Sequence, residues 1–198
     1  PPHSISLCQE SSLIFIRNAR AGQGGGFIIG KQLQVNDSST VSLENVISAG
    51  AGGGFVAIEE VVIAGRSTLN ITNSRAESGN GGGFYTESKF TVSSSSTLVI
   101  LNATGMQGGG FYALGKVAIS SSAVRIQNVI AKGFGGGFMA MKEVVIADRS
   151  TVNITDSRAE NGGGFYSGST FTVSSSSTLV ILNATGMQGG GFCAVGNL

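Results

Sequence analysis

Apolar and polar residues alternate with a period of two in short segments along the chain. In residues 67–71, for example, Leu69 and Ile71 alternate with Thr68 and Asn70. This period is typical of a β-strand with one buried face, whereas an amphipathic helix repeats every 3.6 residues. No stretch has both the length and the periodicity of a helix. The pattern therefore predicts an all-β chain without helical crossovers.

The alternating segments recur at a nearly constant spacing. Each of seven Gly-Gly-Gly triplets precedes a phenylalanine, and these lie 27 to 29 residues apart: Phe27, Phe55, Phe84, Phe111, Phe138, Phe165 and Phe192. Short strands that repeat in this way without helices stack as a parallel β-helix, with about 4.8 Å between neighbouring coils. The sequence thus predicts a right-handed parallel β-helix (β-solenoid) of about seven coils, with three short strands per coil, as a single domain over residues 1–198.

Equivalent positions in successive coils form columns with structural roles. Two aliphatic columns face inward, one from Ile14 to Leu179 and one from Ile16 to Ile181, and the phenylalanines form an aromatic ladder beside glycine corners. A third column predicts a ladder of side-chain hydrogen bonds, in which Asp156 accepts from both of its neighbours: Asn45, Asn73, Asn102, Asn128, Asp156 and Asn183. In a fourth column we expect ion pairs between neighbouring coils, Glu60 with Lys89 and Lys116 with Glu143.

A longer period is superimposed on the coils. The three-coil block that begins near Asn45 is repeated near Asn128, and residues 91–111 are identical to residues 172–192. This duplication indicates a segment of a longer repeat array. We therefore expect neighbouring coils to continue in the native protein, and a full-length transcript without flanking repeats would refute that expectation.

Composition argues against several classes of function. Only 12% of the residues are charged and the net charge is +1, so the chain lacks the basic face that nucleic acid requires. No apolar run approaches 18 residues, which argues against membrane insertion. The chain opens Pro1-Pro2-His3 without a signal peptide, which indicates a processed chain or an excised segment.

Candidate catalytic chemistry is sparse. His3 is the sole histidine, which excludes a histidine-based triad and a multi-histidine metal site. Cys8 and Cys193 lie about six coils apart, too far for a disulfide, and are interpreted as small apolar residues of the stack. We therefore predict no catalytic residue, no metal site and no cofactor, and we expect that the protein is not an enzyme.

The repeats resemble those of a known family. Phe15-Ile16-Arg17-Asn18 matches a Phe-x-x-Asn motif once, and each coil carries Gly-Gly-Gly-Phe in place of a Gly-Gly-x-x motif. These motifs are similar to the repeats of the chlamydial polymorphic membrane proteins, and the coil pattern also resembles the pectin-lyase-like β-helix group. The first resemblance implies a β-helical surface adhesin. It supports the fold and a surface setting more than any activity.

One candidate binding surface follows the phenylalanines. The residue after each of them forms a column that contains all three tyrosines: Ile28, Val56, Tyr85, Tyr112, Met139, Tyr166 and Cys193. If the phenylalanines point inward, this column points outward as an apolar strip about 30 Å long. The strip predicts partner binding, by sugar stacking or protein docking, through Tyr85, Tyr112, Met139 and Tyr166. In the alternative, the parity is reversed and the tyrosines are buried.

Two further features lie on the predicted surface. A threonine file resembles the ice-binding face of β-helical antifreeze proteins, although a single file is also expected from strand propensity: Thr40, Thr68, Thr97, Thr151 and Thr178. Of the five Asn-x-Ser/Thr sequons, Asn102 and Asn183 belong to the asparagine column and should be unmodified. The candidate glycosylation sites are Asn36, Asn70 and Asn153.

Together these patterns favour a non-enzymatic, extracellular or cell-surface scaffold or adhesion module, and glycosylation would make it a glycoprotein. Its expected partners are other surface proteins or polysaccharide, with end-to-end or lateral self-association as a further expectation. Ice binding through the threonine file is the first alternative. The second alternative is the non-catalytic part of a polysaccharide-active enzyme.

Overall fold

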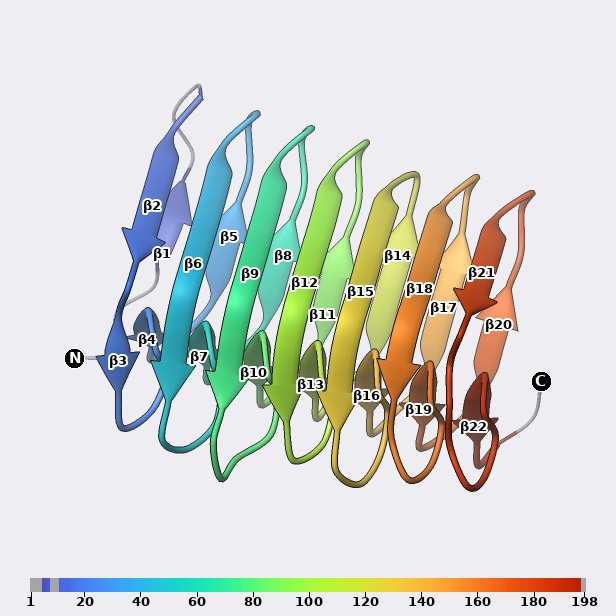
Figure 1. The fold of residues 1–198 in the computed structure, drawn as a ribbon. Coiled ribbons are helices and arrows are strands. Elements are labelled where there is room, and N and C mark those ends of the chain that lie inside the picture. The colour runs from blue at the N-terminus through green and yellow to red at the C-terminus, as the bar shows by residue number, and fades with distance from the viewer. Residues whose placement is uncertain (1–4, 8–10, 197–198) are drawn as a thin grey trace.

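The chain forms a parallel β-solenoid of about seven turns, in which every turn contributes one strand to each of three sheets (Figure 1). The computed structural model describes residues 5–7 and 11–196, so His3 and Cys8 lie outside the described residues. Of residues 5–7 only the backbone is described. No described residue belongs to a helix, so the described part of the chain contains no helix long and apolar enough to cross a membrane. The predicted all-β parallel β-helix with three short strands per coil is confirmed.

Sheets A and C consist of short strands. Sheet A contains β1 (Ile5–Leu7), β5 (Leu33–Val35), β8 (Val61–Ile63), β11 (Phe90–Val92), β14 (Val117–Ser120), β17 (Val144–Ala147) and β20 (Phe171–Val173). Sheet C contains β4 (Phe27–Ile29), β7 (Phe55–Ala57), β10 (Phe84–Thr86), β13 (Phe111–Ala113), β16 (Phe138–Ala140), β19 (Phe165–Ser167) and β22 (Phe192–Ala194). Within each sheet the strands pair in the order in which they occur along the chain.

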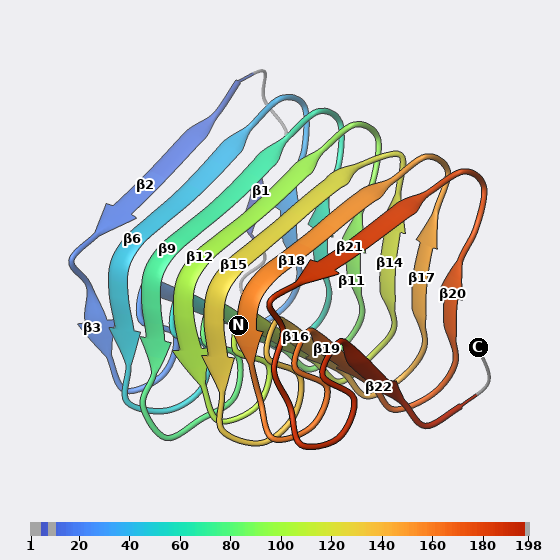
Figure 2. The same ribbon diagram turned by 45° about the vertical axis from the view of Figure 1, so that its right-hand side comes forward.

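Sheet B contains the longest strands and forms one wall of the solenoid, beside the walls made by sheets A and C (Figure 2). Its strands are β2 (Leu13–Arg17), β6 (Thr40–Ser48), β9 (Thr68–Ala76), β12 (Thr97–Gly105), β15 (Ala123–Ala131), β18 (Thr151–Arg158) and β21 (Thr178–Leu182), and β3 (Arg20–Ala21) also pairs with β6. The two aliphatic columns of this sheet face the interior. From β6 to β18, every residue of both columns is at most 2% exposed.

The phenylalanines form the predicted aromatic ladder inside the coils. Rings of successive coils lie 4.8–5.1 Å apart between centroids, and their planes differ by no more than 14°. Phe55 and the next four rings of the column are completely buried. Phe90 and Phe171, from sheet A, contact this ladder edge-on. The offset stacking and the edge contacts are both favourable arrangements of aromatic rings.

Each glycine of a triplet has its own steric reason, as the second corner of the stack shows. Gly52 has a φ of +62°, a backbone conformation that L side chains rarely adopt. A Cβ at Gly53 would lie 2.0 Å from the carbonyl oxygen of Gly82 in the next coil. A Cβ at Gly54 would lie 2.6 Å from the carbonyl oxygen of Gly83. The triplet therefore combines one left-handed residue with two close approaches between coils.

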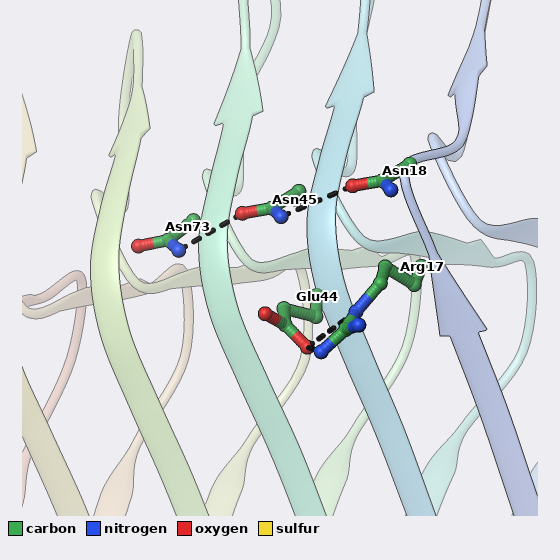
Figure 3. Close-up of polar contacts among 5 residues, drawn as sticks. All are labelled: Arg17, Asn18, Glu44, Asn45 and Asn73. Atoms are coloured by element: carbon green, nitrogen blue, oxygen red, sulfur yellow. Dashed lines mark hydrogen bonds and ion pairs between the residues drawn. The ribbon is translucent and has the colours of Figure 1, made fainter.

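The asparagine ladder runs along the outside of sheet B. Every residue of the column, from Asn18 to Asn183, has a φ between 52° and 55°, a conformation that asparagine and aspartate tolerate well. Asn45 Nδ2 donates to Asn18 Oδ1 over 3.0 Å, and Asn73 Nδ2 donates to Asn45 Oδ1 over 2.9 Å (Figure 3). Asn102 and Asn128 continue the same pattern. The predicted ladder is confirmed, and all its bonds have the same direction.

Asp156 interrupts this ladder in a way that differs from the prediction. Its carboxylate accepts from Asn183 Nδ2 over 3.0 Å, as expected, but the expected bond from Asn128 is absent. The direction of the ladder is the reason, since the residue at position 156 would have to donate to Asn128 Oδ1 and a carboxylate has no proton to donate. Gln127 Nε2 lies 3.5 Å from the second carboxylate oxygen instead.

A second polar ladder lies in the interior and was not predicted. The serines before five sheet B strands, from Ser39 to Ser150, are buried, and the backbone N–H of each donates to the serine hydroxyl of the next coil over 3.1–3.4 Å, the last of these acceptors being the half-buried Ser177. These bonds satisfy backbone donors at the corner between sheets A and B. The recurrent serines were visible in the sequence, but nothing in the pattern indicated that their hydroxyls accept.

The predicted ion pairs between neighbouring coils are confirmed. Lys89 Nζ lies 2.7 Å from Glu60 Oε2, and Lys116 Nζ lies 2.9 Å from Glu143 Oε1. Arg17 forms a further pair with Glu44 over 2.7 Å (Figure 3), and Arg20 pairs with Glu77. All four pairs are partly exposed to solvent, so each contributes at most about 1 kcal/mol and mainly favours one register of the stack.

Candidate functional site

The column that follows the phenylalanines lies on the outer side of sheet C, as the parity of the strand predicts. The expectation of a continuous exposed strip, however, is wrong. Tyr112 and Met139 are 6% and 5% exposed, and Tyr85 and Tyr166 are only half-buried. The loops that carry the triplets fold against this side of the sheet. A Cβ at Gly52 would lie 2.8 Å from Val56 Cγ2, which shows how closely the loop covers the column.

The tyrosines contact other aromatic rings in this covered column. The rings of Tyr85 and Tyr112 stack with a centroid distance of 5.6 Å, and Phe134 contacts Tyr166 edge-on at 5.0 Å. Burial raises the pKa of the Tyr112 hydroxyl above the ordinary tyrosine value of 10.0. Burial also raises the pKa of the Tyr85 hydroxyl, and the nearby Glu87 carboxylate and Tyr112 raise it further. Partner binding by these residues stays a prediction, for which Tyr85 and Tyr166 offer the accessible surface.

The threonine file is in register on the outer face of sheet B. Thr40, Thr68 and Thr97 are half-buried, whereas Thr151 and Thr178 are exposed, and Ala123 interrupts the file between them. The neighbouring outward file is chemically uneven, since it contains a 54% exposed phenylalanine and an arginine: Phe15, Ser42, Asn70, Val99, Arg125, Asn153 and Val180. The structure therefore presents one regular file beside an irregular one.

The candidate glycosylation sites differ in their surroundings. Asn70 and Asn153 lie outward as the third residues of β9 and β18 and are half-buried. Asn36 follows β5, and its Oδ1 is buried without a hydrogen-bond partner. Asn102 and Asn183 each donate Nδ2, the atom that a glycan would occupy, to the ladder. Glycosylation of Asn36, Asn70 and Asn153 stays a prediction.

A hollow that the sequence did not indicate lies on sheet B, across β15, β18 and β21. Its volume is about 530 Å³, and it is lined by Arg125, Gln127, Asn153, Thr155, Asp156, Val180, Leu182 and Asn183. Arg125 Nη2 donates to Gln127 Oε1 over 2.6 Å, and Gln127 lies beside the Asp156 carboxylate. Leu182 on the opposite side is 56% exposed. The hollow thus combines a line of polar groups with an apolar wall.

Two features of the sequence bear on this hollow. Asp156 is the one member of the ladder column, from Asn18 to Asn183, that is not asparagine, and Arg125 is the one charged residue in the file from Phe15 to Val180. The columns show that both residues lie on the same face, but the bridge made by Gln127 depends on side-chain conformation. A periodicity argument does not contain that information.

Two observations concern potential metal ligands and thiols in the described part of the chain. Within residues 5–7 and 11–196, no group of three or more histidine, cysteine, aspartate or glutamate side chains is placed to hold a metal ion. Cys193 is a free, half-buried thiol. Comparisons with known proteins show no family for this chain, because no family model, no curated protein and no solved structure matches it.

Proposed function

We propose that the protein is a non-enzymatic scaffold and adhesion module, extracellular or at the cell surface, which binds polysaccharide in the hollow on sheet B. The hollow carries this proposal, because it places Arg125, Gln127 and Asp156 beside an exposed leucine. A sugar ring combines hydroxyl groups that donate and accept hydrogen bonds with apolar C–H faces, so it matches such a mixed lining.

The frame behind the hollow supports the scaffold part of the proposal. The aliphatic columns, the phenylalanine ladder and the asparagine ladder hold neighbouring coils together along the stack. Close packing of this kind gives a rigid surface, and a preorganised surface loses less entropy on binding than a mobile one. The extracellular or cell-surface setting rests on the resemblance to surface β-helices and on the sequons.

A carbohydrate array probed with the purified chain tests the adhesion role. We expect binding to at least one polysaccharide, and we expect Arg125→Ala to weaken that binding about tenfold or more because a charged hydrogen-bond donor is lost. Arg75→Ala is the matched control, since Arg75 is also exposed on sheet B but lies outside the lining of the hollow. Absence of any glycan binding, or equal affinity of the Arg125→Ala variant, would contradict the proposal.

Ice binding is a second candidate, favoured by the register of the threonine file on the longest sheet. This function predicts measurable thermal hysteresis, which Thr97→Lys would reduce by disturbing the centre of the file. Absence of thermal hysteresis in solutions of the unmodified chain would eliminate this candidate.

A further inference from the structure

We propose that Tyr85 and Tyr112 form a site of oxidative cross-linking, at which a carbon–carbon bond joins their rings and ties two neighbouring coils together. The two residues occupy equivalent positions in β10 and β13 and pair directly in the register of sheet C (Figure 1). Their rings stack with a centroid distance of 5.6 Å and an angle of 8° between the planes. The third tyrosine of the chain, Tyr166, pairs with Met139 and Cys193 instead.

The backbone keeps the two tyrosines opposite each other. Neighbouring parallel strands lie about 4.8 Å apart, a separation that two tyrosine side chains can span. On the inner side of sheet C, Phe84 and Phe111 precede the tyrosines, are completely buried and stack at 4.9 Å. This close packing fixes the register of the two coils, so the outer rings stay side by side while they react.

The hydroxyl ends of the two rings reach water, although loops cover much of this column. Tyr85 is half-buried, and Tyr112 is 6% exposed. Neither hydroxyl makes a hydrogen bond with a described residue, and the buried side-chain atoms without a partner include neither tyrosine oxygen. Both hydroxyl groups therefore meet solvent, which can accept the protons that the reaction releases.

The reaction balances with hydrogen peroxide and a peroxidase as the one-electron oxidant. Each phenol loses one electron and one proton and becomes a phenoxyl radical. Because Tyr85 is the more accessible ring, it is oxidised first, takes an electron from the stacked Tyr112 and is then oxidised again. The two radicals form a bond between one Cε atom of each ring, and the hydrogen on each of these carbons moves to the phenol oxygen. The electrons and protons reduce one hydrogen peroxide to two water molecules, so the chain loses two hydrogen atoms.

The bond would link two coils in the middle of the stack that no disulfide can join. The only cysteines of the chain, Cys8 and Cys193, both lie outside residues 85–112. A covalent link between Tyr85 and Tyr112 closes the chain of one coil into a ring. Such a link restricts the unfolded chain and thereby stabilises the folded stack.

Treatment of the purified chain with a peroxidase and hydrogen peroxide tests the site. At low protein concentration, we expect a monomer that has lost two hydrogen atoms, emits dityrosine fluorescence and yields a cross-linked peptide pair containing Tyr85 and Tyr112 in mass spectrometry. Tyr85→Phe and Tyr112→Phe should each abolish this product, because coupling needs a phenol on both rings. Phenylalanine preserves the stacking, so both variants should remain folded.

Tyr166→Phe is the matched control. Tyr166 lies in the same column and is half-buried like Tyr85, but it has no tyrosine opposite it. This variant should form the monomeric product as the unmodified chain does. Absence of dityrosine in the oxidised unmodified chain, its presence only between chains, or its loss in Tyr166→Phe would overturn the proposal.

Urea unfolding of the oxidised monomer tests the effect on the stack. The cross-linked chain should unfold at a higher urea concentration than the untreated chain, whereas oxidised Tyr112→Phe should unfold at the same concentration as untreated Tyr112→Phe. An unchanged midpoint of the cross-linked chain would show that the bond does not tie the coils together. The proposal does not rest on glycan binding, since the hollow lies on sheet B and the tyrosine pair on sheet C.

Discussion

Residues 91–111 and residues 172–192 have the same sequence but differ in structure. The first copy forms the nine-residue strand β12, whereas the second forms the five-residue strand β21. Met106 of the first copy is half-buried, while the equivalent Met187 is 84% exposed. The difference arises because, among the described residues, the first copy lies between two coils and the second has a coil on one side.

This comparison shows that a coil of this protein owes its burial and strand length to its neighbours. A single coil is one layer thick, so it cannot cover its own upper and lower surfaces. Stability in such an array is approximately a sum of terms within the coils and terms between adjacent coils. Substitutions at equivalent positions of the two copies should therefore differ mainly in the part that the missing interface supplies.

The largest expected difference concerns the ring ladder. Phe111 is completely buried, with stacked rings 4.9 Å and 4.8 Å away on its two sides. Among the described residues, Phe192 has a stacked ring on one side only, that of Phe165, beside a tilted contact with Phe171. Phe111→Ala should lower the free energy of unfolding by about 3–5 kcal/mol, and Phe192→Ala by about half of that. Urea unfolding followed by circular dichroism measures both values. Equal losses would contradict the dependence on neighbours.

A smaller difference is expected at the glycine corners. A Cβ at Gly109 would lie 2.3 Å from the carbonyl oxygen of Gly136, whereas a Cβ at the equivalent Gly190 would have only the oxygen of Ala184 near it, at 3.4 Å. Gly109→Ala should therefore lower the free energy of unfolding by about 1–3 kcal/mol, because the next coil must shift. Gly190→Ala should change it by no more than about 0.5 kcal/mol. The same urea experiment decides this, and an equally destabilising Gly190→Ala would be inconsistent with an open corner.

The ladder residue in the coil before each copy offers two substitutions that should change the free energy of unfolding in opposite directions. Asn102 donates to Asn73, whereas the equivalent Asn183 donates to Asp156. Asp156→Asn should stabilise the protein by about 0.5–1.5 kcal/mol, since the new amide can donate to Asn128 and complete the ladder. Asn73→Asp should destabilise it by a similar amount through loss of the bond to Asn45. If Asp156→Asn destabilised the protein, the carboxylate would contribute more to stability than an asparagine that completes the ladder, and this expectation would be contradicted.

The smallest expected effect lies just beyond the phenylalanines, where Tyr112 follows the first copy and Cys193 the second. Burial raises the pKa of Tyr112 and of its stacked partner Tyr85. Below the ordinary value of 10.0 both tyrosines are protonated in folded and unfolded chains, so they add no pH dependence. Above it the unfolded chain loses these protons first, and stability should fall as the pH rises.

Thermal unfolding at alkaline pH measures this fall. A variant carrying Tyr85→Phe and Tyr112→Phe should lose less stability than the unmodified protein between about pH 9 and about pH 11. Identical pH profiles of the two proteins would contradict the assignment to these tyrosines.

Most of the fold could be predicted from the sequence because the fold repeats. The spacing of the phenylalanines defines the coil, and the period of two assigns each column to the inside or the outside. The ion pairs of Glu60 and Glu143 followed from the same register. A single coil would have been ambiguous, but seven in register leave one consistent arrangement.

The surface was less predictable, for physical reasons that differ by site. Strand parity correctly placed Tyr112 opposite the ring ladder, but it carries no information on whether a loop covers that side. The missing bond between Asn128 and Asp156 depended on the direction of the donors, which identical asparagines do not reveal. The hollow beside Arg125 depends on side-chain conformations within one sheet.

Hydrogen exchange in the two identical segments tests the central claim most directly. Peptides that extend past the identical region, ending at Leu114 or at Val195, differ in mass and can be told apart. On the monomeric chain, we predict that the amides of residues 97–105 exchange only through opening of the whole stack, whereas those of residues 178–186 exchange many-fold faster. Equal protection of the two segments would contradict the account, because their burial would then come from the coil itself and not from its neighbours.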